Sequence, residues 1–299
     1  MNLRFLRTAI AISEYPTFVA AGEALGLSHS AISVHIKALE DELGILIVDR
    51  RKRPPILTDR GIALIENARE IFEIIDNIKS LANEEALIGS MTMGVVPSAL
   101  VNLVPPALAA LRASHPKLQI KIKAELSAEL AQQVRNRDID VAILTEPETP
   151  TQGLRSQFIC DEPFNIIAPA SASGNSQAEL LSQHPFIWFN RRTWAGQLIE
   201  RQLNKSKINV RSVMEVNSLE AIESLVRHGI GVSIVPQRVC APAYDESIKV
   251  LPFGDPQTAR RLVLVDRVNN PRARLADALL EELQLLSTAA VSERQELGG

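Results

Sequence analysis

Residues 20–44 read AAGEALGLSHSAISVHIKALEDELG, and their spacing decides the fold of the first sixty residues. Thr17 can cap a helix over 18–25, Gly26 can take the left-handed conformation of a short turn, and Ser28 can cap the next helix. One face of that next helix carries Ala31, Ile32, His35, Ile36, Leu39 and Leu43. A further helix, which ends near Tyr15, precedes them. Two helices joined by so short a turn predict a helix-turn-helix.

The opposite face of the third helix carries short polar side chains near its N-terminus. It comprises Ser28, His29, Ser30, Ser33, Val34 and Lys37. Such a helix fits the major groove of DNA and meets phosphates with the positive end of its dipole. On the helices alone, a small helical hairpin with a solvated polar face explains the pattern equally well. His35 is expected to pack beneath the helix.

The segment that follows the helices favours the DNA-binding interpretation. Residues 44–48 are apolar and β-branched and predict a short strand, and Ile56 and Leu57 predict a returning strand. The turn between them holds four consecutive cations, Arg50, Arg51, Lys52 and Arg53. A basic two-stranded wing of this kind neutralises backbone phosphates while the neighbouring helix meets the base edges.

These residues resemble the N-terminal domain of LysR-type transcriptional regulators. The shared pattern is the Ala-Ala helix, the recognition-helix start around Ser28–Ser33, the Leu-Glu-x-x-Leu-Gly run at 39–44, and Arg50, Arg53, Leu57-Thr58 and Gly61. Gly22, His29, Val34 and Val48 depart from the residues usual in the family, and two of them face the DNA, so the operator sequence cannot be transferred from a relative. The resemblance implies binding of double-stranded promoter DNA, an indirect action on RNA polymerase, and control by a small metabolite effector.

A long helix is predicted from residue 58 to about residue 87. Apolar residues follow spacings of 4, 3, 4 and 3 along it, the pattern of a coiled-coil seam formed by Leu64, Ala68, Ile71, Ile75 and Ile78. Burial of this face within its own chain is the alternative. The resemblance implies that the helix instead pairs antiparallel with its mate in a homodimer, and that the protein commonly forms a homotetramer.

From residue 90 onward, short β-rich runs alternate with helices, which predicts an α/β fold. The sequence thus divides into a winged helix-turn-helix domain at 1–58, a linker helix at 59–89 and an effector-binding domain at 90–299. This last part is similar to the bilobed fold of periplasmic solute-binding proteins. Lobe I is expected to comprise about 90–161 and 267–299, and lobe II about 162–266.

A small ligand binds between the lobes of such folds, where helix N-termini and hydroxyl groups converge. The resemblance assigns effector contacts to Ser98, Ser127, Thr145 and Thr193, and Asn217 begins a further helix facing the cleft. Each of them can instead be a simple cap or turn residue. Arg191 and Arg192 are candidates for neutralising an anionic effector, although two exposed loop arginines often have no specific role.

Composition and motifs narrow the function classes. The chain has 299 residues, a net charge of −3 and 46% hydrophobic residues, so any binding of DNA depends on a local basic cluster. The histidines show no metal-binding spacing, and no HExxH, GxSxG, Walker or GxGxxG motif is present, so we expect neither an enzyme nor a metal or other cofactor. A solute-binding protein explains only residues 90–299.

Cys160 and Cys240 are too far apart in sequence for a CxxC motif, and both are expected to be buried hydrophobic residues, with a redox pair as the alternative. No signal peptide and no apolar run long enough to cross a bilayer is found, so we expect a cytoplasmic protein without a membrane partner.

Overall fold

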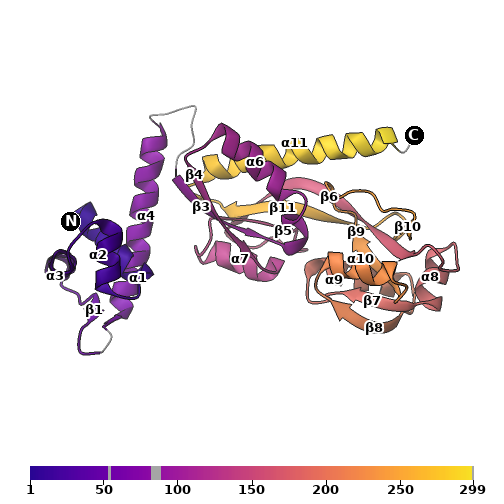
Figure 1. The fold of residues 1–299 in the computed structure, drawn as a ribbon, viewed down its shortest axis with the longest axis horizontal. Helices are drawn as coiled ribbons and strands as arrows, with labels where there is room; N and C mark the ends of the chain where they lie inside the picture. The colour runs from indigo at the N-terminus through magenta and orange to yellow at the C-terminus, as the bar shows by residue number, and fades with distance from the viewer. Residues whose placement is uncertain (53–54, 82–88, 298–299) are drawn as a thin grey trace. The chain divides into compact units, whose positions relative to one another are not determined.

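The computed structural model describes residues 1–52, 55–81 and 89–297. These residues belong to two compact units, 1–82 and 83–299, which are described separately (Figure 1). The first unit contains α1 (Leu3–Glu14), α2 (Phe18–Leu25), α3 (His29–Leu43), β1 (Val48–Asp49), β2 (Ile56–Leu57) and α4 (Asp59–Leu81). The predicted three helices and wing are confirmed in kind and order.

The caps predicted from the sequence set the ends of α2 and α3. The Thr17 hydroxyl accepts a hydrogen bond from the backbone N–H of Ala20, and the Ser28 hydroxyl accepts one from Ala31. Gly26 ends α2 with a φ of +65°. Gly22 has a steric reason to lack a side chain, because a Cβ built there would lie 2.6 Å from the carbonyl oxygen of Leu27. The short turn and the close helix pair therefore depend on each other.

The strand predicted over 44–48 is wrong in extent, because only Val48 of that run joins the sheet. Gly44 ends α3 in a left-handed conformation, and Ile47 is fully buried in the core of the unit without pairing in the sheet. The Ile47 carbonyl oxygen accepts a hydrogen bond from the backbone N–H of Thr58 at 3.0 Å. A Cβ at Gly61 would lie 2.2 Å from the same oxygen, so α4 begins in close contact with the wing. Burial rather than strand pairing explains the apolar run.

The second unit is built on a nine-stranded sheet. Its strands are β3 (Gly89–Val95), β4 (Leu118–Ala124), β5 (Val141–Thr145), β6 (Leu154–Pro169), β7 (Pro185–Phe189), β8 (Arg211–Val216), β9 (Val232–Pro236), β10 (Ile248–Pro252) and β11 (Ala259–Arg267). Their order is β4-β3-β5-β11-β6-β9-β7-β8, and β10 pairs with β6. Strand β3 pairs in parallel with both β4 and β5, whereas β6 and β11 pair antiparallel. The predicted α/β architecture is confirmed.

The helices of this unit are α5 (Pro97–Leu100), α6 (Val104–Ser114), α7 (Ser127–Arg135), α8 (Gln177–Gln183), α9 (Trp194–Lys205), α10 (Leu219–Arg227) and α11 (Ala273–Leu297). Figure 1 shows α6 and α11 together on one face of the β3-β5-β11 sheet and α7 on the other. The sequence pattern predicts neither α5 nor α8. It predicts β6 only from Phe164 onward, and it predicts a last helix that ends at Leu286, whereas α11 continues to Leu297.

Two hydrophobic cores define two lobes within this unit. Lobe I packs around Met93, Ile143 and Leu264, and lobe II packs around Phe164, Phe186 and Ile234. The long strand β6 passes from one to the other, because Ile159 lies in the first core and Phe164 in the second. Leu262–Val265 pack in lobe I, so the chain returns to lobe I before residue 262, whereas the sequence placed the end of lobe II at residue 266. None of the described helices is long and apolar enough to span a membrane.

Candidate nucleic-acid interface and ligand pocket

The N-terminal half of α3 presents the side chains predicted to meet DNA. His29, Ser30, Val34 and Lys37 are exposed, and Val34 keeps 63% of its surface accessible. Ser33 is half-buried, and the Ser28 hydroxyl already serves as the helix cap and contacts the Ser30 hydroxyl at 2.9 Å. These exposed side chains on the first turns of α3 are therefore accessible for contact with a groove of DNA.

His35 lies on the inner side of α3, as expected. Its Nδ1 is 2.9 Å from the Thr8 hydroxyl, and its ring lies 4.5 Å from the ring of Phe5. These contacts hold α3 against α1. His35 is therefore a packing residue, whereas His29 remains at the surface.

The wing is fastened to α3 by a buried carboxylate that the sequence interpretation missed. Glu40 keeps 7% of its surface exposed, and its Oε1 accepts hydrogen bonds from the backbone N–H groups of Ile47 (2.9 Å) and Val48 (3.2 Å). Its Oε2 accepts a hydrogen bond from Nη2 of Arg50 at 3.0 Å. Arg50 thus has a structural partner within the first unit, in addition to its predicted role in binding DNA. The run of apolar residues after Gly44 offers no sign of this contact.

Arg51 is highly exposed, with 89% of its side chain accessible. Its Nε and Nη2 donate to the two carboxylate oxygens of Asp49 at 2.9 and 3.0 Å. The side-chain and backbone hydrogen bonds from Arg51 lower the pKa of Asp49 to about 2, so this carboxylate is charged at neutral pH. Lys52 is exposed, and Arg53 lies outside the described residues. Asp49 therefore offsets one of the positive charges that the wing offers to phosphate.

The predicted seam on α4 is split between two environments. Ala68 is fully buried in the hydrophobic core of the first unit, and Leu64 and Ile71 are half-buried against that core. Ile75 is half-buried, and Ile78 is 60% exposed. Ala68 is thus covered by its own chain and is not available to a partner subunit, which corrects its assignment to the seam. In the described part of α4, Ile74 and Ile78 are exposed towards the C-terminal end, and Ile62 is exposed near the start.

The second unit holds a cavity of about 160 Å³ between its lobes. All five residues predicted to contact an effector line it: Ser98, Ser127, Thr145, Thr193 and Asn217. They come from α5, α7, β5, the start of α9 and the start of α10. Neither Arg191 nor Arg192 lines this cavity. The Arg191 side chain instead donates to Glu215 at 3.2 Å and lies over the Trp188 ring.

The lobe I hydroxyls differ from the lobe II residues in how they are used. Ser98, Ser127 and Thr145 are each at least nine-tenths buried, and the Ser127 hydroxyl accepts a weak hydrogen bond from the Thr145 backbone N–H at 3.4 Å. Thr193 caps α9: its hydroxyl accepts from the Gly196 N–H at 2.9 Å and donates to the Asn190 carbonyl at 2.7 Å. Asn217 is exposed. The cap interpretation thus describes Thr193, and the Ser98 and Thr145 hydroxyls are better placed to hold a ligand.

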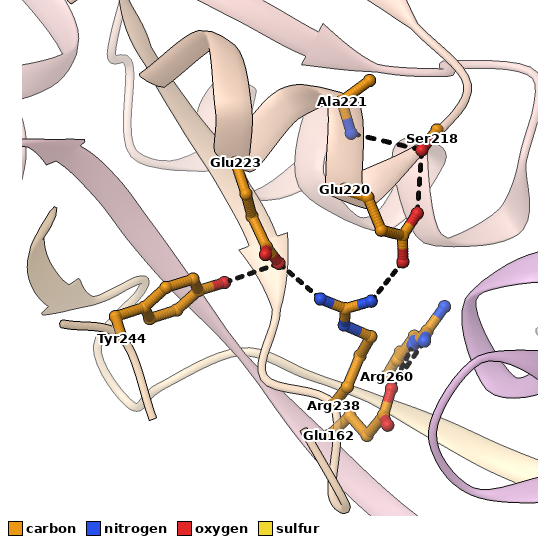
Figure 2. Close-up of polar contacts among 8 residues, drawn as sticks. All are labelled: Glu162, Ser218, Glu220, Ala221, Glu223, Arg238, Tyr244 and Arg260. Atoms are coloured by element: carbon orange, nitrogen blue, oxygen red, sulfur yellow. Dashed lines mark hydrogen bonds and ion pairs between the residues drawn. The ribbon is translucent and has the colours of Figure 1, made fainter. Parts of the chain in front are cut away.

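Two charged residues that the sequence interpretation missed also line the cavity. Arg260 is 2% exposed, and its Nε and Nη2 donate to Oε2 of Glu162 at 2.8 and 2.5 Å (Figure 2). Glu220, near the start of α10, accepts a hydrogen bond from the Ser218 hydroxyl at 2.8 Å and forms an ion pair with Arg238. Neither residue belongs to a motif, and their ion-pair partners lie 18 and 98 residues away in the sequence, so no local pattern could have found these ion pairs.

Arg238 links the cavity wall to the loop that follows β9. It pairs with Glu220 and with Glu223, and the Tyr244 hydroxyl donates to Glu223 at 3.1 Å (Figure 2). The backbone N–H of the next residue, Val239, donates to Oε1 of Glu162 at 3.1 Å. Through the backbone from Arg238 to Val239, these ion pairs and hydrogen bonds link Glu220 to Glu162 and Arg260.

Neither cysteine lines the cavity. Cys160 is buried, and burial together with the Glu162 carboxylate raises the pKa of its thiol well above the ordinary value. Cys240 is half-buried and packs against the lobe I core. Within the described residues, no group of three or more His, Cys, Asp or Glu side chains is placed to hold a metal ion.

A winged helix-turn-helix followed by a bilobed α/β unit with a cavity between its lobes defines a class of DNA-binding transcriptional regulators. Two family models match the chain: the bacterial regulatory helix-turn-helix protein of the lysR family at residues 3–62, and the LysR substrate binding domain at residues 84–286. The chain belongs to the LysR family.

Similar proteins span almost the whole chain. A hydrogen peroxide-inducible genes activator of Haemophilus influenzae is 26% identical over 95% of this chain and 98% of its own length. A probable nitrogen assimilation transcriptional activator of Synechococcus elongatus is 27% identical over 89% of this chain and 88% of its own. Relatives of comparable identity thus carry names from different physiological responses, so identity at this level does not specify an effector.

Solved structures agree on the fold. The C206 mutant of Corynebacterium glutamicum OxyR is 25% identical, with a TM-score of 0.71 over 99% of this chain and 96% of that one. CbnR, a LysR family transcriptional regulator, is 21% identical, with a TM-score of 0.58 over 96% of this chain and 99% of that one.

Proposed function

We propose that this regulator is controlled by a small-molecule effector that binds in the cavity between lobes I and II. The observation that supports the proposal is the convergence of five residues, selected from the sequence, on one cavity. Ser98 and Thr145 place buried hydroxyl groups there, and buried hydroxyl groups without strong partners are suited to orient a polar ligand. We expect no catalytic reaction, because the chain belongs to a family of transcriptional regulators.

At the DNA end, we propose that α3 enters the major groove and that Arg51, Lys52 and Arg53 approach the phosphates. Arg50 holds the wing through its ion pair with Glu40, and we propose that it also contacts DNA. We further propose that the exposed C-terminal part of α4, around Ile75 and Ile78, pairs with the same helix of a second copy, so that two heads bind one operator. The protein is expected to act in the cytoplasm, as a homodimer or homotetramer on double-stranded promoter DNA.

The effector site is tested with Ser98→Ala and Thr145→Val in the full chain. After a thermal-shift screen has identified a ligand, calorimetry should show that each variant binds it roughly 3- to 100-fold more weakly, because a hydrogen bond to a ligand contributes about 0.5–3 kcal/mol. Operator binding without ligand should be unchanged. Ser206→Ala, which removes an exposed hydroxyl after α9, is the matched control. Equal ligand affinity in all three variants would place the effector site elsewhere.

A further inference from the structure

The cavity between the lobes carries two charged side chains of opposite sign. Arg260 is contributed by β11 and Glu220 by α10, and both line the cavity. Each charge already has a protein partner, Glu162 for Arg260 and Arg238 for Glu220, so a ligand meets only the hydrogen-bonding capacity that these ion pairs leave free. The two charged side chains therefore restrict the chemical class of the ligand.

Arg260 has one nitrogen available for a ligand. Its Nε and Nη2 both donate to Glu162, and among the described residues no acceptor lies within hydrogen-bond distance of Nη1. The residue is 98% buried yet lines the cavity, so Nη1 is the donor that a ligand can reach. A guanidinium nitrogen forms its strongest hydrogen bonds with a carboxylate or another anionic oxygen.

The surroundings of Arg260 suit a carboxylate in particular. The Ser98 and Thr145 hydroxyls line the same cavity, and the nine-residue helix α7 begins there with Ser127. Hydroxyl groups and the positive end of a helix dipole both stabilise negative charge. Glu162 already neutralises Arg260, so a single carboxylate, rather than two, matches the donors that remain.

Glu220 provides the opposite charge. Its Oε1 is occupied by Arg238 and its Oε2 by the Ser218 hydroxyl, and each oxygen retains capacity for a further donor. Partial burial opposes ionisation, but hydrogen bonds from its own backbone N–H, from Ser218 and from Arg238 keep the pKa of Glu220 below its ordinary value. A carboxylate on the cavity wall repels a second acidic group of a ligand and attracts an ammonium group.

The remaining lining is largely apolar. Val96, Val101, Leu126, Phe189 and Leu219 contribute side chains to the cavity. An aliphatic group is the complement of such a surface, because each buried CH₂ contributes about 0.8 kcal/mol. A cavity of about 160 Å³ admits only a small molecule.

We propose that the effector is a small zwitterionic α-amino acid with an uncharged apolar side chain. Its carboxylate accepts hydrogen bonds from Nη1 of Arg260 and from the lobe I hydroxyls, and its ammonium group donates to Glu220. This inference rests on the proposed effector site and names the chemical class that the site takes. A dicarboxylate would bring a second acidic group towards Glu220, and a simple cation would leave Nη1 of Arg260 without an acceptor.

The test compares matched ligands on the full-length protein by thermal shift and calorimetry. The probes are the twenty standard amino acids and, for each aliphatic one that binds, its counterparts without the ammonium group and without the carboxylate. For L-leucine these counterparts are 4-methylpentanoate and 3-methylbutylamine. At least one aliphatic amino acid should bind, and roughly 10- to 100-fold more tightly than its counterpart lacking the ammonium group, the range expected for one hydrogen bond to a charged group. Equal binding of the carboxylate-only counterpart would overturn the proposal.

Two variants assign the charges. Glu220→Gln should weaken amino-acid binding roughly 10-fold or more and leave the affinity for the carboxylate-only counterpart unchanged. Glu223→Gln is the matched control, because Glu223 also pairs with Arg238 but does not line the cavity. Replacing the buried pair together, with Glu162→Leu and Arg260→Met, avoids leaving one charge unpaired and should abolish the preference for a carboxylate.

The outcomes separate this proposal from the proposed function. If no amino acid binds but another ligand does, and Ser98→Ala weakens that ligand, the amino-acid assignment is wrong and the effector site stands. If a ligand binds and neither Ser98→Ala nor Glu220→Gln changes its affinity, whatever its chemical class, the proposed effector site itself is wrong.

Discussion

Removing the Glu40 carboxylate should release the wing from α3. Its Oε1 accepts hydrogen bonds from Ile47 and Val48, whose side chains are almost fully buried, and its Oε2 holds Arg50. In Glu40→Ala each of the two backbone N–H groups loses its acceptor, at about 1–3 kcal/mol each. The ion pair with Arg50, whose side chain is 47% exposed, adds about 0–1 kcal/mol.

The sum is about 2–7 kcal/mol, a large part of the 5–15 kcal/mol that holds an ordinary domain together. Hydrogen exchange measured by mass spectrometry on a peptide covering residues 44–52 of the full chain reports the change locally. A loss of about 2 kcal/mol predicts roughly 30-fold faster exchange at residues 47 and 48. DNA affinity should fall with it, because the cations of the wing are no longer held beside α3.

Asp41→Ala provides the matched control, since it removes an exposed carboxylate from the same helix. Its exchange should equal that of the unaltered chain. Glu40→Gln should lie between the two, because an amide oxygen still accepts a backbone hydrogen bond but carries no charge for Arg50. Unchanged exchange at residues 47 and 48 in Glu40→Ala would refute the idea that this carboxylate anchors the wing.

Two further predictions concern the DNA-binding unit. Arg51→Ala should weaken binding to all DNA sequences and reduce the slope of log K against log salt by about 1, whereas Asp49→Asn should free Arg51 and raise DNA affinity. Fluorescence anisotropy over a salt series measures both effects. A loss of affinity in Asp49→Asn would show that Asp49 instead positions the wing. Ile78→Asp should dissociate the oligomer in analytical ultracentrifugation and remove tight operator binding, because burying isoleucine contributes about 1.5–3 kcal/mol per subunit; an assembly of unchanged mass would place that surface of α4 on solvent.

Local features of the fold were predictable from the sequence. The bounds of α2 agree residue for residue with the predicted helix over 18–25, and α3 begins after its predicted cap Ser28, because capping residues and helical periodicity act within one or two turns. The long strand β6 was found only in its second half. Its first half, residues 154–163, mixes exposed and buried positions without strict alternation, since one strand serves both lobes.

The candidate site was predictable to a similar degree. Ser98, Ser127, Thr145, Thr193 and Asn217 were found because each stands at the end of a strand or the start of a helix, which short patterns reveal, and because they match a family's positions. Ala68 was misassigned because its helical face contacts the head of its own chain along part of its length. A heptad pattern records that a face is apolar, and it does not record what covers that face.

The sequence by itself determined the helix-turn-helix, the basic wing, the alternation of strands and helices, and the hydroxyl groups of the cavity, since these depend on residues close together in the chain. Only the tertiary structure decided how the charged residues are used. Glu40 reaches backbone seven and eight residues away across a turn, and Glu162 and Arg260 meet from positions 98 residues apart. Whether a charge in an apolar strand is tolerated depends on the partner that folding brings to it, and neither periodicity nor composition contains that pairing.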